Sequence, residues 1–105
     1  MSEARKVLMI FIDETDKHED MSLYEAIVRR LLLRGVAGAT VNVGIMGYGV
    51  HHRVHHKRLL GVSDDRPITV TAVDTEEKLR SVLPQITELV GGQGLVLLFD
   101  AEVIG

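Results

Sequence analysis

The sequence predicts an α+β fold, in which a four-stranded antiparallel sheet carries two helices on one face. Two observations lead to this prediction. The expected elements follow the order β-α-β-β-α-β, and each half of the chain contains a strand followed by an amphipathic helix. The chain has 105 residues, which is the usual length of a single domain, so we expect one domain spanning residues 1–105. This element order is that of the split β-α-β, or ferredoxin-like, arrangement.

The composition narrows the class of protein. Apolar residues make up 46% and charged residues 26%, as in a globular protein, and the net charge of −3 argues against a nucleic-acid partner. Cysteine is absent, which excludes disulfides, thiolate metal sites and thiol nucleophiles. No apolar run approaches the roughly 20 residues that cross a bilayer, and the N-terminus lacks a signal-peptide pattern. We therefore expect a cytoplasmic protein.

The first half of the chain contains a strand and a helix. In Lys6–Ile12 every residue after Lys6 is apolar, which predicts a central strand. The acidic segment 13–20 lacks the spacing of a calcium loop and is predicted to be a solvated surface loop. A helix is expected over about residues 22–34, because Ser22 and Glu25 have capping-box spacing and an apolar stripe follows them. Gly35 is suited to the position just after this helix.

The middle of the chain contains a strand and a long connection. Residues 39–46 are predicted to form a strand with Gly44 as a bulge, and Gly47-Tyr48-Gly49 to break it. Residues 50–66 show no clear period and end in a turn signature.

The last part of the chain contains two strands and a helix between them. Residues 68–73 alternate between apolar and polar, which predicts a strand with one wet face. Asp74 and Glu77 have capping-box spacing at the start of a second helix, in which Pro84 is expected to cause a kink or a restart. The glycines of segment 91–94 end this helix, and residues 95–99 form the last strand. Because both helices cover one face of the sheet, we expect other subunits to bury the opposite face.

Two short segments are candidates for ligand contact. Gly38-Ala39-Thr40 combines close backbone approach with a hydroxyl, which suits a ribose or a phosphate. The alternative is that Gly38 is required by a tight helix-to-strand turn. Tyr48, between two glycines, either stacks on a base or a neighbouring subunit or simply forms a turn.

The run from His51 to Arg58 has three interpretations. Arg53, Lys57 and Arg58 offer positive charge to an anion, and histidines protonated below about pH 6.5 add to it. On a helical turn, the pairs His51/His55 and His52/His56 could instead bind zinc, nickel or copper. The third interpretation is a solvated loop. No catalytic triad, phosphate-binding loop or carboxylate pair stands out, so we do not expect an enzyme.

A series of short segments along nearly the whole chain carries a resemblance to a known family. They are Lys6-Val7-Leu8, Leu23-Tyr24-Glu25-Ala26-Ile27-Val28, Gly35-Val36-Ala37-Gly38-Ala39-Thr40-Val41, Gly44-Ile45-Met46-Gly47-Tyr48-Gly49, His55, Leu59-Leu60 with Ser63, Asp65-Arg66-Pro67-Ile68 and Val73-Asp74. In this order and spacing they resemble the PII-like proteins grouped as domain-of-unknown-function family 190. More remotely, they resemble the PII nitrogen-signalling proteins.

The resemblance implies a homotrimer with nucleotide clefts between neighbouring subunits. It implies an adenine nucleotide or a related small anion as effector, and it makes residues 47–66 a mobile loop that contacts a partner such as a membrane transporter or an enzyme. The nucleotide-binding residues implied in this way are Gly38, Ala39, Thr40, Tyr48, Arg53, His55, Lys57 and Arg58.

One departure from the PII pattern bears on the nucleotide. PII proteins have a lysine-bearing loop between the second helix and the last strand, whereas this chain has Gly91-Gly92-Gln93-Gly94, which contains no cation. We therefore expect AMP or ADP rather than ATP. The competing hypothesis is a metal-binding trimer similar to CutA proteins, which uses His51, His52, His55 and His56.

Overall fold

The computed structural model describes residues 2–49, 55–56 and 65–105, and its elements follow the predicted order. The helices are α1 (Leu23–Leu33) and α2 (Glu76–Val90). The strands are β1 (Glu3–Asp13), β2 (Lys17–His18), β3 (Met21–Ser22), β4 (Ala39–Val43), β5 (Met46–Gly47), β6 (His55–His56), β7 (Pro67–Asp74) and β8 (Leu95–Val103). Neither described helix is long and apolar enough to cross a membrane.

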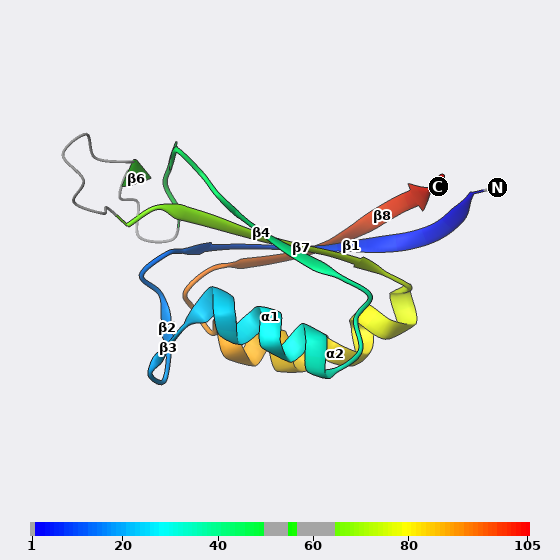
Figure 1. The fold of residues 1–105 in the computed structure, drawn as a ribbon, viewed down its shortest axis with the longest axis horizontal. Coiled ribbons are helices and arrows are strands. Elements are labelled where there is room, and N and C mark those ends of the chain that lie inside the picture. Colours follow the sequence, from blue (N-terminus) through cyan, green and yellow to red (C-terminus); the bar gives the residue numbers. More distant parts are fainter. Residues whose placement is uncertain (1, 50–54, 57–64) are drawn as a thin grey trace.

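The main sheet has four strands in the order β4-β7-β1-β8, and every neighbouring pair is antiparallel. Both helices lie against the same face of this sheet (Figure 1). The predicted ferredoxin-like fold is thereby confirmed. β1 is central, as its continuous apolar run predicted, because it pairs with β7 on one side and with β8 on the other.

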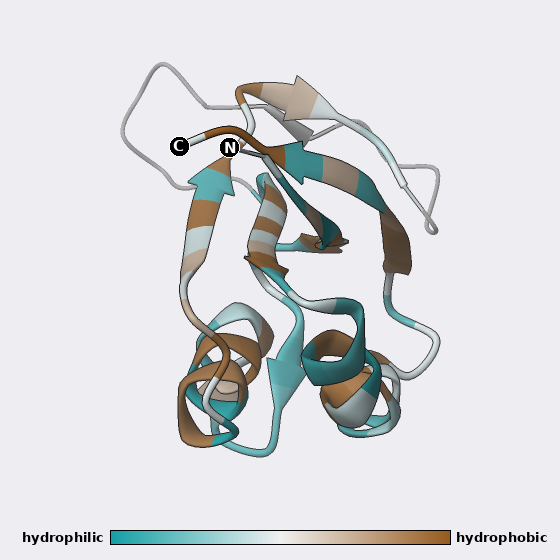
Figure 2. Ribbon diagram, turned by 90° about the vertical axis from the view of Figure 1, so that its right-hand side faces the viewer, coloured by the Kyte–Doolittle hydropathy of each residue, from teal (hydrophilic) through white to brown (hydrophobic). Residues whose placement is uncertain are grey.

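The hydrophobic core lies between the helices and the sheet. Every second residue of the two central strands points into it, and Figure 2 shows the apolar sides of the two helices turned toward the same space. The fully buried large side chains are Leu8, Ile10, Leu23, Ile27, Leu31, Ile68, Val70, Leu79, Val82, Ile86 and Val90. Only 4% of the residues are aromatic, and aliphatic side chains fill this core.

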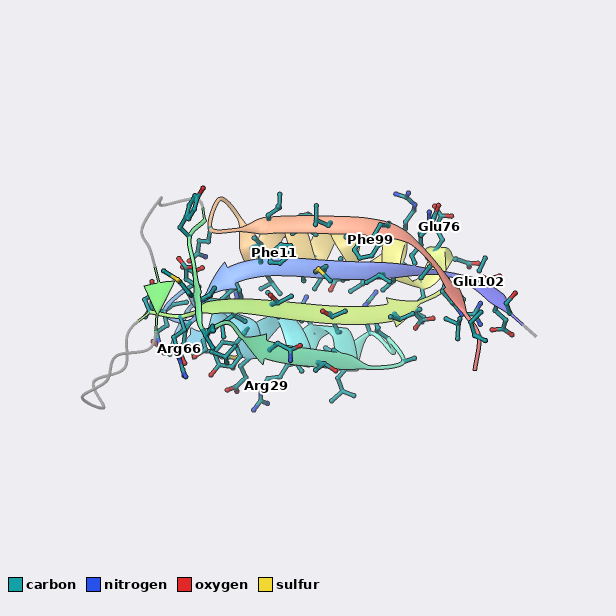
Figure 3. All side chains as sticks on the ribbon, turned by 90° about the horizontal axis from the view of Figure 1, so that it is seen from above. Phe11, Arg29, Arg66, Glu76, Phe99 and Glu102 are labelled. Carbon is teal, nitrogen blue, oxygen red and sulfur yellow. The ribbon has the colours of Figure 1, made fainter. Side chains whose placement is uncertain are left out.

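The opposite face of the sheet, which we call the open face, has no cover among the described residues. Three cross-strand rows lie on it, centred on Val7, Met9 and Phe11 of β1, and the β8 members of these rows are Phe99, Leu97 and Leu95. Phe11, Phe99 and Leu95 remain 40%, 42% and 53% exposed, and Figure 3 looks down on this face. The uncovered apolar face predicted from the sequence is present.

Two strands are longer than predicted. β1 begins at Glu3 and β8 continues to Val103, and the two remain paired beyond the helices, with Glu3 opposite Val103 and Lys6 opposite Asp100. Backbone pairing carries this extension, and the ammonium of Lys6 forms an ion pair with Asp100. The sequence pattern missed the extension of β1 because Glu3, Arg5 and Lys6 are charged, whereas residues 100–103 of β8 continue a polar/apolar alternation that the prediction did not use.

The helix ends confirm one prediction and correct two. Gly35 has φ +80°, its N–H donates to the Leu32 carbonyl at 3.1 Å, and Val36 N–H donates to the Leu31 carbonyl at 3.0 Å, as in a Schellman motif. The capping box at the start of α1 is wrong, since Ser22 makes no side-chain cap and Glu25 pairs with Arg29 at 2.9 Å.

The start and course of α2 also differ from prediction. Thr75 rather than Asp74 caps the helix, because its hydroxyl accepts from Lys78 N–H at 3.1 Å. The restart expected at Pro84 is wrong, since α2 runs unbroken from Glu76 to Val90. Pro84 has no N–H to donate to the Arg80 carbonyl, and both residues lie on the exposed side of the helix.

The acidic segment 13–20 is an ordered structure rather than a solvated loop. It contains β2, which pairs with β3 just after the segment, and Asp16 is only 9% exposed. Both side-chain oxygens of Glu14 accept from the guanidinium of Arg66, at 2.9 and 2.5 Å. The prediction failed because the partner that orders the segment lies 52 positions away in the chain.

The predicted strand 39–46 is divided at Gly44, where the sequence suggested a bulge. β4 ends at Val43, and Gly44 N–H donates to the Pro67 carbonyl at 2.7 Å. Gly47 does not break a strand, because it belongs to β5, which pairs with β6.

Candidate functional site

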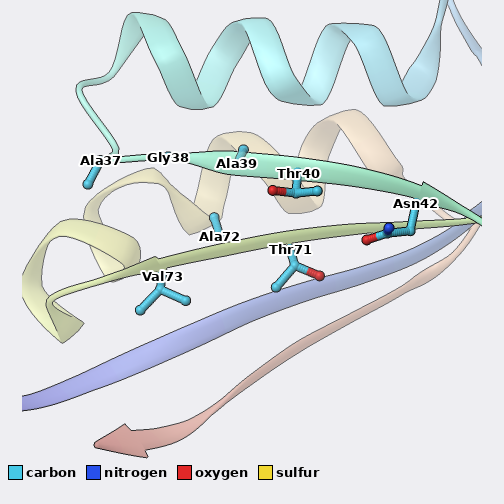
Figure 4. A pocket seen from close by; sticks show the side chains of 8 residues that line it. All are labelled: Ala37, Gly38, Ala39, Thr40, Asn42, Thr71, Ala72 and Val73. Carbon is cyan, nitrogen blue, oxygen red and sulfur yellow. The ribbon is translucent and has the colours of Figure 1, made fainter. Parts of the chain in front are cut away.

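A cavity of about 670 Å³ runs along the edge strand β4 and its neighbour β7, and we call it the β4–β7 hollow. Its lining consists of small, neutral residues: Ala37, Gly38, Ala39, Thr40, Asn42, Thr71, Ala72 and Val73. Figure 4 shows these residues on the two strands and on the connection from α1. The structure therefore brings the predicted residues Gly38, Ala39 and Thr40 together in one hollow.

The polar groups of this hollow come from paired positions. Thr40 lies opposite Thr71, and Asn42 lies opposite Thr69. Thr40, Asn42 and Thr71 belong to the open-face side of their strands, whereas Ala39 and Ala72 lie opposite each other on the helix side. Hydroxyl and amide groups both donate and accept hydrogen bonds, which suits an uncharged polar ligand such as a ribose or a purine edge.

Beside the β4–β7 hollow, the carboxylate of Asp74 accepts two backbone hydrogen bonds. Its Oδ2 accepts from Ala37 N–H at 3.0 Å, and its Oδ1 accepts from Thr75 N–H at 2.7 Å. The carboxylate thus joins the α1–β4 connection to the start of α2. Sequence reasoning assigned Asp74 to a helix cap, and only its position among the residues of the family resemblance pointed to another role.

The fold does not require a glycine at position 38. Among the described residues, positive-φ glycines are found only at positions 35 and 91, and the tight turn after α1 uses Gly35. A Cβ atom added at Gly38 would meet no described atom within 4 Å. The turn explanation for Gly38 is therefore wrong, and its backbone is open to the hollow.

A second cavity of about 580 Å³, the β5 hollow, lies between β5, the adjoining ends of β1 and β7, and the α2–β8 connection. Tyr48, a predicted site residue, lines it and is 71% exposed. Asp13 is the one charged residue in the described lining. The two hollows are adjacent, because Asn42 of the first lies opposite Thr69 of the second.

Gly94 closes one side of the β5 hollow by close backbone contact. A Cβ atom at this position would lie 2.3 Å from the Phe11 carbonyl oxygen and 2.6 Å from Ile12 Cγ2. Only a glycine allows the α2–β8 connection to approach β1 this closely.

The other predicted site residues belong to a segment that the structure describes only at residues 55–56. Arg53, Lys57, Arg58, His51 and His52 lie outside the described residues. His55 and His56 form β6 and pair with Gly47 and Met46 in an extended conformation. The helical spacing assumed for the metal hypothesis is therefore not found at these two positions, and the described part of the chain contains no group of three potential metal ligands.

Three carboxyl groups have lowered pKa values because each forms an ion pair, and most of these pairs lie away from the hollows. Hydrogen bonding from Arg66 lowers the pKa of Glu14, and hydrogen bonding from Lys6 lowers the pKa of Asp100. Hydrogen bonding from Arg80 lowers the pKa of Glu76. These carboxylates are held ionised by structural partners, and of the three only Glu14 adjoins a hollow.

Comparison with known sequences places the chain in a family. The family described as DUF190, uncharacterized ACR, matches residues 5–103. The chain belongs to this family. A UPF0166 protein of Methanocaldococcus jannaschii is 37% identical over 98 residues, which cover 93% of this chain and 90% of that protein. The family suggested by the sequence motifs is confirmed.

Two solved structures share the fold. CPII, a nitrogen regulatory PII-like protein from Thiomonas intermedia K12, was solved bound to ADP, AMP and bicarbonate; it matches with a TM-score of 0.74 and 24% identity, covering 98% of this chain and 91% of that one. The apo form of CPII matches with a TM-score of 0.66 and 22% identity, covering 98% and 95%. This DUF190 chain thus has the fold of PII-like proteins.

Proposed function

We propose that this protein is a PII-like signalling protein that binds an adenine nucleotide in the β4–β7 hollow. The observation that carries the proposal is Gly38, a glycine that the fold does not need, beside the hydroxyl of Thr40 in an open polar hollow. A missing side chain lets a ligand approach the backbone closely, and the neighbouring hydroxyl and amide groups supply hydrogen bonds. That CPII was solved with ADP and AMP supports the choice of ligand.

The proposed assembly is a homotrimer with the nucleotide between subunits. The open face carries exposed Phe11, Leu97 and Phe99, and a contiguous apolar surface of this kind marks a protein interface. The β4–β7 hollow borders this face, so a neighbouring subunit packed there would close it from outside. The neighbour's β5 hollow, with Tyr48 on its wall, is the proposed second half of the site.

The charge of the hollows bears on which nucleotide binds. Neither described lining contains a cation. Phosphate charge is therefore assigned to four of the basic residues in the 47–66 loop: Arg53, His55, Lys57 and Arg58. With no lysine in the α2–β8 connection, we propose AMP or ADP rather than ATP as the effector.

The output of the protein is proposed to be a contact made by residues 47–66. At the root of this loop Ile45 and Tyr48 are 83% and 71% exposed, which suits a docking surface for another protein. A ligand that binds one arrangement of the loop more tightly shifts the protein toward that arrangement. The partner is proposed to be a cytoplasmic enzyme or the cytoplasmic side of a membrane transporter.

Calorimetry with AMP, ADP and ATP tests this function, with sedimentation on the same sample. We expect one site per chain, tighter binding of AMP and ADP than of ATP, and a trimer. The nucleotides should be recovered unchanged, because the proposed role is regulatory. No heat and no thermal shift with any of the three at millimolar concentration would contradict the proposal.

A further inference from the structure

The ion pair between Glu14 and Arg66 lies where the acidic segment meets the start of β7. We infer that this pair is a positioning device for the β5 hollow, and that it holds the hollow's Gly44–Gly47 wall in place through Pro67. Its effect on nucleotide affinity rests on the proposed function, whereas its effect on the wall does not.

The two residues are joined through both side chain and backbone. Arg66 Nε donates to Glu14 Oε1 at 2.9 Å and Nη2 donates to Oε2 at 2.5 Å, while Glu14 N–H donates to the Arg66 carbonyl at 2.8 Å. Only 23% of the Glu14 side chain and 30% of the Arg66 side chain are exposed. A two-pronged contact of this kind fixes orientation as well as distance, unlike a single surface ion pair.

Further hydrogen bonds hold the backbone on either side of Glu14 in place. Asp13 N–H donates to Asp16 Oδ2 at 2.9 Å, and the Asp16 carbonyl accepts from Leu23 N–H at 2.8 Å. Thr15 N–H donates to Asp65 Oδ1 at 3.1 Å, which adds a second link to the residue before Arg66. The acidic segment thus connects the first residue of α1 with the start of β7.

On the Arg66 side, the next residue, Pro67, contacts the Gly44–Gly47 wall of the β5 hollow. Asp13 and Pro67, the chain neighbours of the ion pair, lie opposite each other and both line the β5 hollow. The Pro67 carbonyl accepts from Gly44 N–H at 2.7 Å. The Pro67 ring also packs tightly here, because a Cβ atom added at Gly44 or Gly47 would lie 2.7 or 3.4 Å from its Cγ. Any shift of Pro67 therefore moves the Gly44–Gly47 wall.

The test compares variants of the pair with a matched control. Glu14→Gln and Arg66→Gln remove the charge, Arg66→Lys keeps the charge without the planar fork, and Glu14→Arg with Arg66→Glu exchanges the partners. Glu76→Gln is the control, because it breaks the Glu76–Arg80 pair on α2, which lines neither hollow. The readouts are hydrogen exchange at the Gly44 amide without ligand, the thermal midpoint, and the Kd for AMP.

Glu14→Gln and Arg66→Gln should accelerate Gly44 exchange about tenfold and weaken AMP binding, with Arg66→Lys intermediate, since local opening exposes this amide. Exchanging the partners should restore part of both effects, and Glu76→Gln should change neither. Unchanged Gly44 exchange in Glu14→Gln and Arg66→Gln would overturn the inference. If Gly44 exchange rises but the wild type binds no nucleotide, the positioning role stands and the proposed function fails.

Discussion

The variant Gly38→Ala tests whether Gly38 is needed for the fold or for ligand binding. The added methyl group would meet no described atom within 4 Å, and the position does not have the positive φ that favours glycine. The folded state therefore loses nothing, while the unfolded chain loses conformational freedom. We expect the free energy of unfolding to stay the same or to rise by up to about 1 kcal/mol.

Unlike the stability, the affinity of Gly38→Ala for AMP should decrease. A methyl group that projects into the β4–β7 hollow keeps a nucleotide from approaching the backbone at Gly38. We expect AMP affinity to fall at least about tenfold, which corresponds to roughly 1.4 kcal/mol of binding free energy. A larger side chain, in Gly38→Val, should weaken binding further.

Urea unfolding and calorimetry on the same preparations measure both effects, at one fixed protein concentration because an oligomer's stability depends on it. Gly92→Ala is the matched control, since a Cβ there also meets no described atom within 4 Å and Gly92 lines neither hollow. It should change stability as Gly38→Ala does and leave affinity unchanged. A loss of more than about 1 kcal/mol of stability in Gly38→Ala would show that the glycine is structural after all. Unaltered AMP affinity would show that the nucleotide does not contact this backbone.

Three further variants probe the packing, the assembly and the pH dependence. Gly94→Ala places a methyl group 2.3 Å from the Phe11 carbonyl oxygen. This variant should lower the free energy of unfolding in urea by about 1–3 kcal/mol relative to Gly92→Ala. Equal stability of the two variants would contradict the close approach of Gly94 to β1. Phe99→Glu puts a charge on the open face and should convert the proposed trimer to monomers in sedimentation, whereas an unchanged sedimentation coefficient would place the interface elsewhere. Because Arg66 lowers the pKa of Glu14, the pair contributes stability above the unfolded-state pKa of Glu14 and loses it as pH falls through the folded-state pKa. The thermal midpoint of the wild type should therefore fall more steeply with acid than that of Glu14→Gln, and parallel pH profiles would refute this.

The elements were predictable because their signals are local. The apolar run of β1, the stripes of α1 and α2 and the glycine after α1 each depend on residues within a few turns of one another. The extension of β1 before Lys6 was not predictable in this way, since backbone pairing with the other end of the chain holds it in the sheet.

The polar contacts that join distant parts of the chain could not be predicted from local spacing. Glu14 meets Arg66 across 52 positions, and Asp74 meets Ala37 across 37. Local spacing instead suggested caps for Ser22 and Asp74 that the structure does not form. For the site, the pattern Gly38-Ala39-Thr40 was sufficient to locate one hollow, whereas the neighbouring β5 hollow depends on how Pro67 and Gly94 pack.

Amide chemical shifts of the wild-type protein during an AMP titration test the nucleotide site most directly. We predict that the largest changes fall at Gly38 just before β4, at Thr40 on β4 and at Thr71 and Val73 on β7, and that they saturate at one AMP per chain. Changes confined to the exposed side of α2, or none at millimolar AMP, would contradict a nucleotide site in the β4–β7 hollow.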